Sequence, residues 1–159
     1  MASDPHKADT NMQNGAMTEV IGIDHIYIAV SDMRRSERFY DCVLLDTLGF
    51  RKNTFTLGGE PHIQYYNRHF GYVLRRSSTV IMPGALTPGL HHLCLRVDAP
   101  ADVVAVAARL REQGIEATDA KHYQEYAPDY WAAHFNDPDG IRLEVTNYRQ
   151  ERRDRHDNW

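Results

Sequence analysis

The stretches Gly22-Ile-Asp-His25-Ile-Tyr-Ile-Ala-Val30 and Gly89-Leu-His-His92-Leu-Cys-Leu-Arg-Val97 decide the fold. Both follow one pattern: a glycine, a histidine three residues later, and apolar residues at alternate positions up to a valine. Alternation with a period of two is typical of a β-strand that buries one face. Because the pattern recurs with its histidine in the same place, each stretch should open one copy of an internal repeat.

The segments that follow the two stretches also correspond. In the first copy, Ser31 or Asp32 can cap a helix that Gly49 ends, and in the second, Asp98 can cap a helix that Gly114 ends. Further strand patterns follow each helix. Neither copy can bury both faces of its strands alone, so the two must pair, either within the chain or by exchange between chains. The sequence therefore predicts an α+β fold, in which two βαβββ modules pair into a cupped mixed β-sheet with the helices on the outside.

The repeat also sets the predicted domain boundaries. Residues 1–19 are polar and lack apolar periodicity, so they are expected to form a flexible N-terminal tail. Residues 20–148 form the two-module domain, with module 1 at about 20–82 and module 2 at about 88–148. Residues 149–159 are charged almost throughout and are expected to form a charged C-terminal tail, either as a frayed helix or as a loose segment.

Composition excludes several classes of protein. The net charge of −4 gives no sign of binding to nucleic acid or to an anionic membrane. No apolar run reaches the roughly 18 residues that a membrane span needs. Two cysteines, Cys42 and Cys94, make no disulfide framework, so a reducing cytoplasm is the expected location. A small-molecule substrate is then the expected partner.

Alternation predicts which side chains share a face of the sheet. It places His25, His92 and Glu144 on the face opposite the apolar residues of their strands, and it turns His91 the other way. Two neutral imidazoles and one carboxylate are suitable ligands for a divalent metal ion. They would leave coordination positions open, which favours a catalytic over a structural metal site.

Five motifs carry a resemblance to a known family: D-H-I-Y-I-A-V at 24–30, S-E-R-F-Y at 36–40, L-G-F at 48–50, H-L-C-L-R-V at 92–97 and D-P-D-G-I-R-L-E-V at 137–145. They resemble the vicinal oxygen chelate superfamily, which includes glyoxalase I, extradiol dioxygenases, fosfomycin-modifying enzymes, methylmalonyl-CoA epimerase and bleomycin-binding proteins. The resemblance implies a cupped sheet around one metal ion that binds substrates through adjacent oxygens. It also implies a homodimer.

One departure from the family pattern bears on the reaction. Glyoxalase I and the epimerase resemble each other in a fourth protein ligand on the last strand of the first module. Aligning 71–75 with 140–144 puts Arg75 at that position, and an arginine cannot ligate a cation. Arg75 is then either a partner for a substrate carboxylate or phosphonate, or a solvated residue at the rim. The remaining three-ligand set resembles that of extradiol dioxygenases, so Fe(II) is favoured over Mn(II), Ni(II) or Zn(II).

Two further residues are candidates for catalysis. His134 stands ten positions before Glu144, where the extradiol enzymes resemble one another in a tyrosine, and it could transfer protons. Tyr130 ends a tyrosine-rich loop, 122–130, that is expected to line the mouth of the cleft. Ring-opening oxygenation is the favoured reaction. A glyoxalase-type lyase or isomerase, a fosfomycin-type thiol transferase and a metal-free drug-binding protein of the bleomycin-resistance type remain alternatives.

Overall fold

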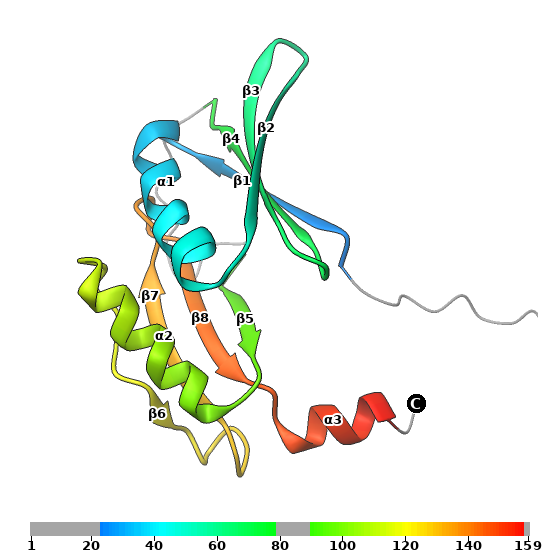
Figure 1. Ribbon diagram of the computed structural model, residues 1–159, viewed down its shortest axis with the longest axis vertical. Coiled ribbons are helices and arrows are strands. Elements are labelled where there is room, and N and C mark those ends of the chain that lie inside the picture. Colours follow the sequence, from blue (N-terminus) through cyan, green and yellow to red (C-terminus); the bar gives the residue numbers. More distant parts are fainter. Residues whose placement is uncertain (1–22, 79–89, 158–159) are drawn as a thin grey trace, which may run out of the picture.

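The computed structural model describes residues 23–78 and 90–157, and within them the predicted repeat is confirmed (Figure 1). Module 1 contains β1 (His25–Val30), α1 (Met33–Tyr40), its π-helical continuation η1 (Asp41–Thr47), β2 (Arg51–Leu57), β3 (Glu60–Tyr66) and β4 (Gly71–Arg76). Module 2 contains β5 (Leu93–Val97), α2 (Pro100–Glu112), β6 (Lys121–His122), β7 (Trp131–Asn136) and β8 (Arg142–Asn147), and it is followed by α3 (Gln150–Asp157).

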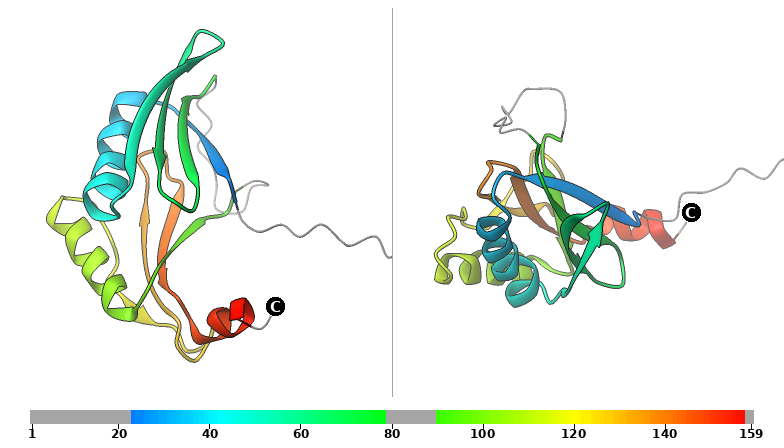
Figure 2. Two further views of the ribbon diagram at one scale, coloured as in Figure 1. Left: turned by 45° about the vertical axis from the view of Figure 1, so that its right-hand side comes forward. Right: turned by 90° about the horizontal axis from the view of Figure 1, so that it is seen from above.

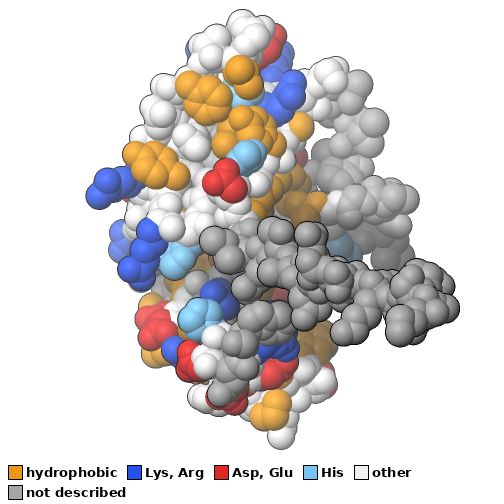
Figure 3. Space-filling view, turned by 90° about the vertical axis from the view of Figure 1, so that its right-hand side faces the viewer, with side chains coloured by type: hydrophobic (Ala, Val, Ile, Leu, Met, Phe, Trp, Pro, Cys, Tyr) orange, Lys and Arg blue, Asp and Glu red, His pale blue; other side chains and the backbone are white. Residues whose placement is uncertain are grey.

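Each module forms its own four-stranded sheet, and the two sheets have the same strand order. The orders are β1-β4-β3-β2 and β5-β8-β7-β6, with the first strand of each module parallel to the last. Helices α1 and α2 lie on the same side of the molecule, so neither covers the opposite side of the two sheets, and α3 lies beyond the end of β8 (Figures 1 and 2). We call that opposite side the helix-free face. There, hydrophobic and histidine side chains gather over module 1, and charged side chains over module 2 (Figure 3).

Burial confirms the predicted faces of the strands. On β1, Ile28 and Val30 are buried under the helices, whereas His25, Tyr27 and Ala29 are exposed. Corresponding apolar residues of module 2 join the same core, among them Leu95, Leu143 and Val145. Each such side chain contributes about 1.5–3 kcal/mol when fully buried, and this term fixes the register because a slip by one residue would expose the whole set.

The two helix starts differ from each other. Asp32 caps α1 as predicted, since its carboxylate accepts a hydrogen bond of 3.0 Å from a backbone N–H of the first turn. The prediction that Asp98 caps α2 is wrong. Ala99 occupies the cap position, and the carboxylate of Asp102 accepts a hydrogen bond of 2.9 Å from the Ala99 N–H. A carboxylate in the first turn satisfies the same unpaired donors.

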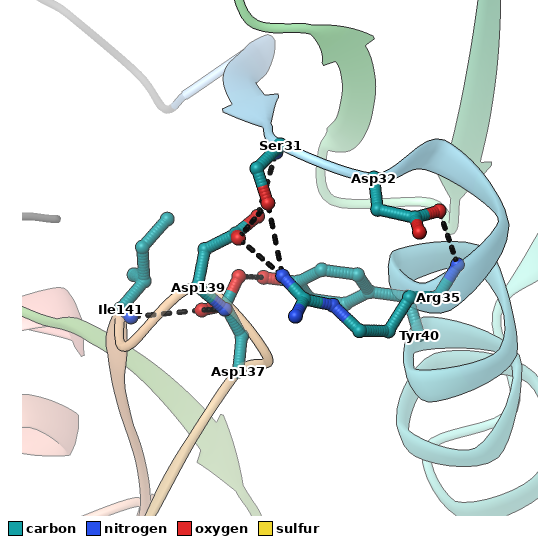
Figure 4. Close-up of polar contacts among 7 residues, drawn as sticks. All are labelled: Ser31, Asp32, Arg35, Tyr40, Asp137, Asp139 and Ile141. Atoms are coloured by element: carbon teal, nitrogen blue, oxygen red, sulfur yellow. Dashed lines mark hydrogen bonds and ion pairs between the residues drawn. The ribbon is translucent and has the colours of Figure 1, made fainter. Parts of the chain in front are cut away.

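The Asp-Pro-Asp-Gly turn between β7 and β8 joins the two modules (Figure 4). Asp139 accepts hydrogen bonds from the Ser31 N–H at 2.9 Å and from the Arg35 guanidinium at 2.6 Å. Asp137, 4% exposed, accepts a 2.9 Å hydrogen bond from the Tyr40 hydroxyl, and burial raises the pKa of this carboxyl. The turn therefore anchors module 2 on the start of α1 as well as closing a hairpin.

Up to residue 157, the C-terminal residues form α3 and contact module 2. Arg153 of α3 lies 2.7 Å from the Asp98 carboxylate. The Tyr148 ring is flanked by the guanidinium groups of Arg96 and Arg153, at 4.1 and 4.3 Å from its centroid. The expected N-terminal tail and the expected boundary between modules fall largely outside the described residues. No helix of the described chain has the length and apolar character to cross a bilayer.

Candidate functional site

Glu144, in the middle of β8 on the helix-free face, is the centre of the candidate site. It is 5% exposed although it carries an ionisable carboxyl group. His92, just before β5, places its Nε2 3.4 Å from Glu144 Oε2, and His134 on β7 places its Nε2 3.6 Å from the same oxygen. His134 and Glu144 are direct partners in the antiparallel pairing. Two of the predicted residues, His92 and His134, thus converge on one carboxylate oxygen of a third, Glu144.

The other oxygen of Glu144 has a different partner. The Tyr130 hydroxyl donates a hydrogen bond of 2.5 Å to Oε1. Burial and this carboxylate raise the pKa of Tyr130, so the hydroxyl keeps the proton that it donates. The Arg149 guanidinium lies 4.7 Å from the centroid of the same ring. Tyr130 therefore holds Glu144 with Oε2 directed towards the two histidines.

His91 has a role that alternation did not predict. Its Nδ1 lies 2.7 Å from Nδ1 of His92, so one ring donates a proton to the other. The prediction that His91 turns away is wrong because β5 begins only at Leu93, and strand alternation does not apply before it. A partner on the far nitrogen fixes the orientation of an imidazole and directs its other nitrogen, here towards Glu144.

Burial lowers the pKa of His134, and the charges of Arg142 and His92 act in the same direction, while Glu144 opposes them. The ring is therefore neutral at neutral pH and can accept a proton. The edge of Tyr123 packs against it at 5.7 Å between centroids. Burial and the nearby Glu144 raise the pKa of Cys94 to about 12. That thiol stays protonated, which fits a filler and not a nucleophile.

His25 and Arg75, the remaining predicted residues, lie in module 1. His25 places its Nδ1 2.6 Å from Asp24 Oδ2, packs on the edge of Tyr27, and lines a cavity of about 360 Å³. Arg75 is exposed on β4. In residues 23–78 and 90–157, no group of three or more His, Cys, Asp or Glu side chains is arranged to hold a metal ion. The predicted triad of His25, His92 and Glu144 is thus not assembled in the described part of one chain.

The model of the Glyoxalase/Bleomycin resistance protein/Dioxygenase superfamily matches residues 22–145. The chain belongs to this superfamily. No curated protein matches the sequence.

Solved structures of similar fold include several members of the glyoxalase superfamily. A glyoxylase/bleomycin resistance protein/dioxygenase domain from Frankia sp. EAN1pec is 22% identical, with a TM-score of 0.67 over 82% of this chain and 100% of that one. The fosfomycin resistance protein FosX from Listeria monocytogenes is 13% identical, with a TM-score of 0.62 over 85% and 99%. Lactoylglutathione lyase from Agrobacterium tumefaciens is 19% identical, with a TM-score of 0.57 over 82% and 94%.

Strand pairing in this glyoxalase-superfamily fold corrects the alignment of the two modules. His25 pairs with Gly71, and one step before the Leu93–Leu143 pair His92 faces Arg142. Gly71 is thus equivalent to Arg142, and the residue equivalent to Glu144 lies two positions after Gly71. That residue is Val73, so the prediction that Arg75 takes the fourth-ligand position is wrong.

The alignment failed because it matched two glycines with different roles. Gly140 lies in the β7–β8 turn with a φ of +83°, a conformation that favours glycine. Gly71 lies inside β4, where an added Cβ would meet Gln64 Nε2 at 3.2 Å and His25 Cβ at 3.4 Å. The turn before Gly71 is also one residue shorter, since Asn67–Phe70 replaces Asp137–Ile141.

The same pairing identifies the partner of His134 in module 1. Gln64 pairs with Val73, just as His134 pairs with Glu144. Module 1 therefore has a histidine, a glutamine and a valine where module 2 has two histidines and a glutamate. Two residues beside Glu144 were not singled out from the sequence: Arg142, which shares its face two positions earlier, and Arg149, which was assigned to a tail. Alternation along β8 does place Arg142 on the face of Glu144, but it assigns this arginine no role.

Proposed function

We propose that the protein is a divalent-metal-dependent enzyme that binds a small substrate through two adjacent oxygens. His92 and Glu144 supply two ligands, and His25 supplies the third. One observation carries the proposal: a carboxylate 5% exposed directs Oε2 to two imidazole nitrogens at 3.4 and 3.6 Å. A buried carboxylate needs a cation or several donors, and two imidazoles with a carboxylate are donors of the type that Fe(II), Mn(II), Ni(II) and Zn(II) take.

The ligand set is completed by bringing together the helix-free faces of a first and a second module. β1 and β5 are both edge strands, with one side that has no strand partner in its sheet. An unpaired edge is a surface for association. We propose that a homodimer brings His25 of one copy to His92 and Glu144 of the other, which is a closed twofold arrangement.

The residues of this chain then have separate roles. A divalent ion held by His25, His92 and Glu144 would supply Lewis-acid stabilisation of negative charge on the substrate oxygens. His134, neutral because burial lowers its pKa, accepts a proton from the bound substrate. Tyr130 keeps Glu144 Oε1 occupied. Val73 adds neither a ligand nor a base at the fourth position, and this favours ring-opening oxygenation of a catechol-type diol over isomerisation.

Metal analysis of protein purified without chelator tests the proposal, followed by an activity screen. The screen contains catechols with Fe(II), fosfomycin with a thiol, and the hemithioacetal of methylglyoxal and glutathione. We expect about one metal ion per chain and turnover of a catechol. His25→Ala and His92→Ala should each lose the metal, whereas His69→Ala, exposed in the β3–β4 turn, should keep it. Full metal content in the His25 and His92 variants would overturn the ligand assignment, and turnover of only the second or third substrate would overturn the reaction class.

A further inference from the structure

A cavity of about 1190 Å³ adjoins the candidate site. One side comes from Arg111 and residues 114–118, and the other from the ends of β7 and β8, including His134 and Arg142. Its apolar lining residues are Phe39, Ile115, Ala117, Phe135 and Pro138. His134 lines this cavity and also lies 3.6 Å from Glu144, so this residue connects the cavity with the candidate site.

Two arginines line this cavity, and they differ in their partners. Arg111 is neutralised, since its Nη1 lies 2.7 Å from the Asp119 carboxylate and donates to the Thr118 carbonyl at 3.3 Å. Arg142 is exposed, and in the described part of the chain no carboxylate lies within ion-pair distance of its guanidinium. A cation without a protein counter-ion at the side of a cavity is available to an anionic ligand.

The position of Arg142 brings this charge to the candidate site. It lies two residues before Glu144 on the same strand, so both side chains emerge on the helix-free face. In the parallel pairing it faces the position of His92. A group held by Arg142 would therefore lie beside the two residues proposed to bind the metal.

Among the described residues, neither acidic side chain that lines the cavity, Glu116 or Asp137, pairs with the Arg142 guanidinium. Glu116 is on the same side as Arg111. Asp137 is buried, and its carboxylate accepts hydrogen bonds from the N–H groups of Asp139 and Ile141 and from the Tyr40 hydroxyl. Because the Asp137 carboxylate already accepts these three hydrogen bonds, it does not compete with an anionic ligand for the Arg142 guanidinium.

We infer that Arg142 forms an anion subsite, which takes the carboxylate, phosphonate or phosphate group of a small substrate. A planar guanidinium matches such oxyanions with two parallel hydrogen bonds. The inference deepens the proposed function by naming a substrate class, and it rests on that function only for the location of the reacting atoms. Arg142, and not Arg75, is then the arginine that selects the substrate.

Calorimetric titration of the full chain in the presence of chelator tests the subsite. The probes are phenylphosphonate and benzoate, with benzyl alcohol as the neutral match. Arg142→Ala and Arg142→Gln should weaken binding of both anions by about tenfold or more, since hydrogen bonds to charged groups are the strong ones. Arg111→Ala, in the same cavity but already paired, should change either affinity less than about twofold. The two anion arms show which oxyanion the subsite prefers.

Three results would overturn the subsite: unchanged anion affinity in both Arg142 variants, equal losses in the Arg111 and Arg142 variants, or benzyl alcohol binding as tightly as the anions. Metal content is measured separately on every variant. Arg142→Ala should keep its metal, because arginine is no ligand. If the wild-type protein binds anions through Arg142 but has no affinity for metal, the subsite is supported and the proposed metal-dependent function is rejected. Failure of the subsite can therefore be told apart from failure of the proposed function.

Discussion

The helix-free faces of the two modules have the same strand order and pairing but opposite chemical character. Module 2 carries His92, His134 and Glu144 in contact with one another. Module 1 carries His25, Gln64 and Val73 at the equivalent positions. One module thus has a buried acid and the other a buried apolar residue at the same point of the β-sheet. The comparison teaches that the two modules keep the same backbone pairing while the contacting ionisable side chains of this face are concentrated in module 2.

The turns that precede the last strand of each module also differ. In module 2, Asp137 and Asp139 contact residues of α1 and the end of β1, so this turn joins the modules (Figure 4). In module 1, the side chain of Asn67 accepts hydrogen bonds from the N–H groups of His69 and Phe70, within its own turn. Module 2, which carries Glu144, thus also supplies the turn that joins the two modules. Disruption of that turn should therefore destabilise both modules.

The largest effect is expected when the acid of module 2 is removed. Glu144→Gln keeps the shape but removes the negative charge, so divalent-metal affinity should fall by more than the roughly 10–100-fold typical of outer-shell partners. Calorimetry with Mn(II) and Zn(II) measures the change. Glu116→Gln, an exposed carboxylate on the cavity side, should leave affinity unchanged. Equal affinity in wild type and Glu144→Gln would show that Glu144 is not a metal ligand.

The second effect comes from giving module 1 the acid of module 2. Val73 is 2% exposed, so Val73→Glu should destabilise the metal-free protein by a few kcal/mol because an ionised carboxylate loses its hydration there. If the position is equivalent to Glu144, added metal should restore a large part of this loss, as measured by denaturant unfolding. Arg75→Glu, at an exposed site, should change stability by less than about 0.5 kcal/mol and gain nothing from metal. Metal rescue of Arg75→Glu alone would restore the earlier alignment.

Positions 73 and 75 show how much of the fold and of the candidate site could be predicted from the sequence. Period-two alternation found the repeat, the buried faces of β1, β5 and β8, and the convergence of His92 with Glu144, because burial of apolar side chains fixes the register of each strand. It could not compare positions across turns of different length, which is why Arg75 was matched to Glu144. Alternation also turned His91 the wrong way, because His91 lies before its strand, and it could not place Arg149, which follows β8 and packs on the Tyr130 ring.

A third, smaller effect concerns the hydrogen bond that orients Glu144. Tyr130→Phe removes the donor to Oε1 but keeps the ring, so Glu144 gains freedom to rotate and metal affinity should fall by about 10–100-fold. Tyr126→Phe is the matched control, because Tyr126 packs on the Tyr130 ring but is 66% exposed. The ratio of the two affinities is the measurement. A loss in Tyr126→Phe as large as in Tyr130→Phe would assign the effect to the aromatic cluster and not to the hydrogen bond.

The smallest effect is a pH dependence of the module joint. Burial raises the pKa of Asp137 above its usual 3.8, so the folded state holds this proton more tightly than the unfolded state does. Stability is then lost as pH rises from 3.8 through the folded pKa, because ionising the buried carboxyl becomes costly. Asp137→Asn removes the ionisation. Its amide oxygen can still accept the N–H groups of Asp139 and Ile141, and its NH₂ can donate to the Tyr40 hydroxyl. Urea unfolding across this pH range should therefore give the variant a flatter profile than wild type, whereas Asp46→Asn, at an exposed site in η1, should keep the wild-type profile. Parallel profiles for Asp137→Asn and wild type would show that this carboxyl titrates alike in both states.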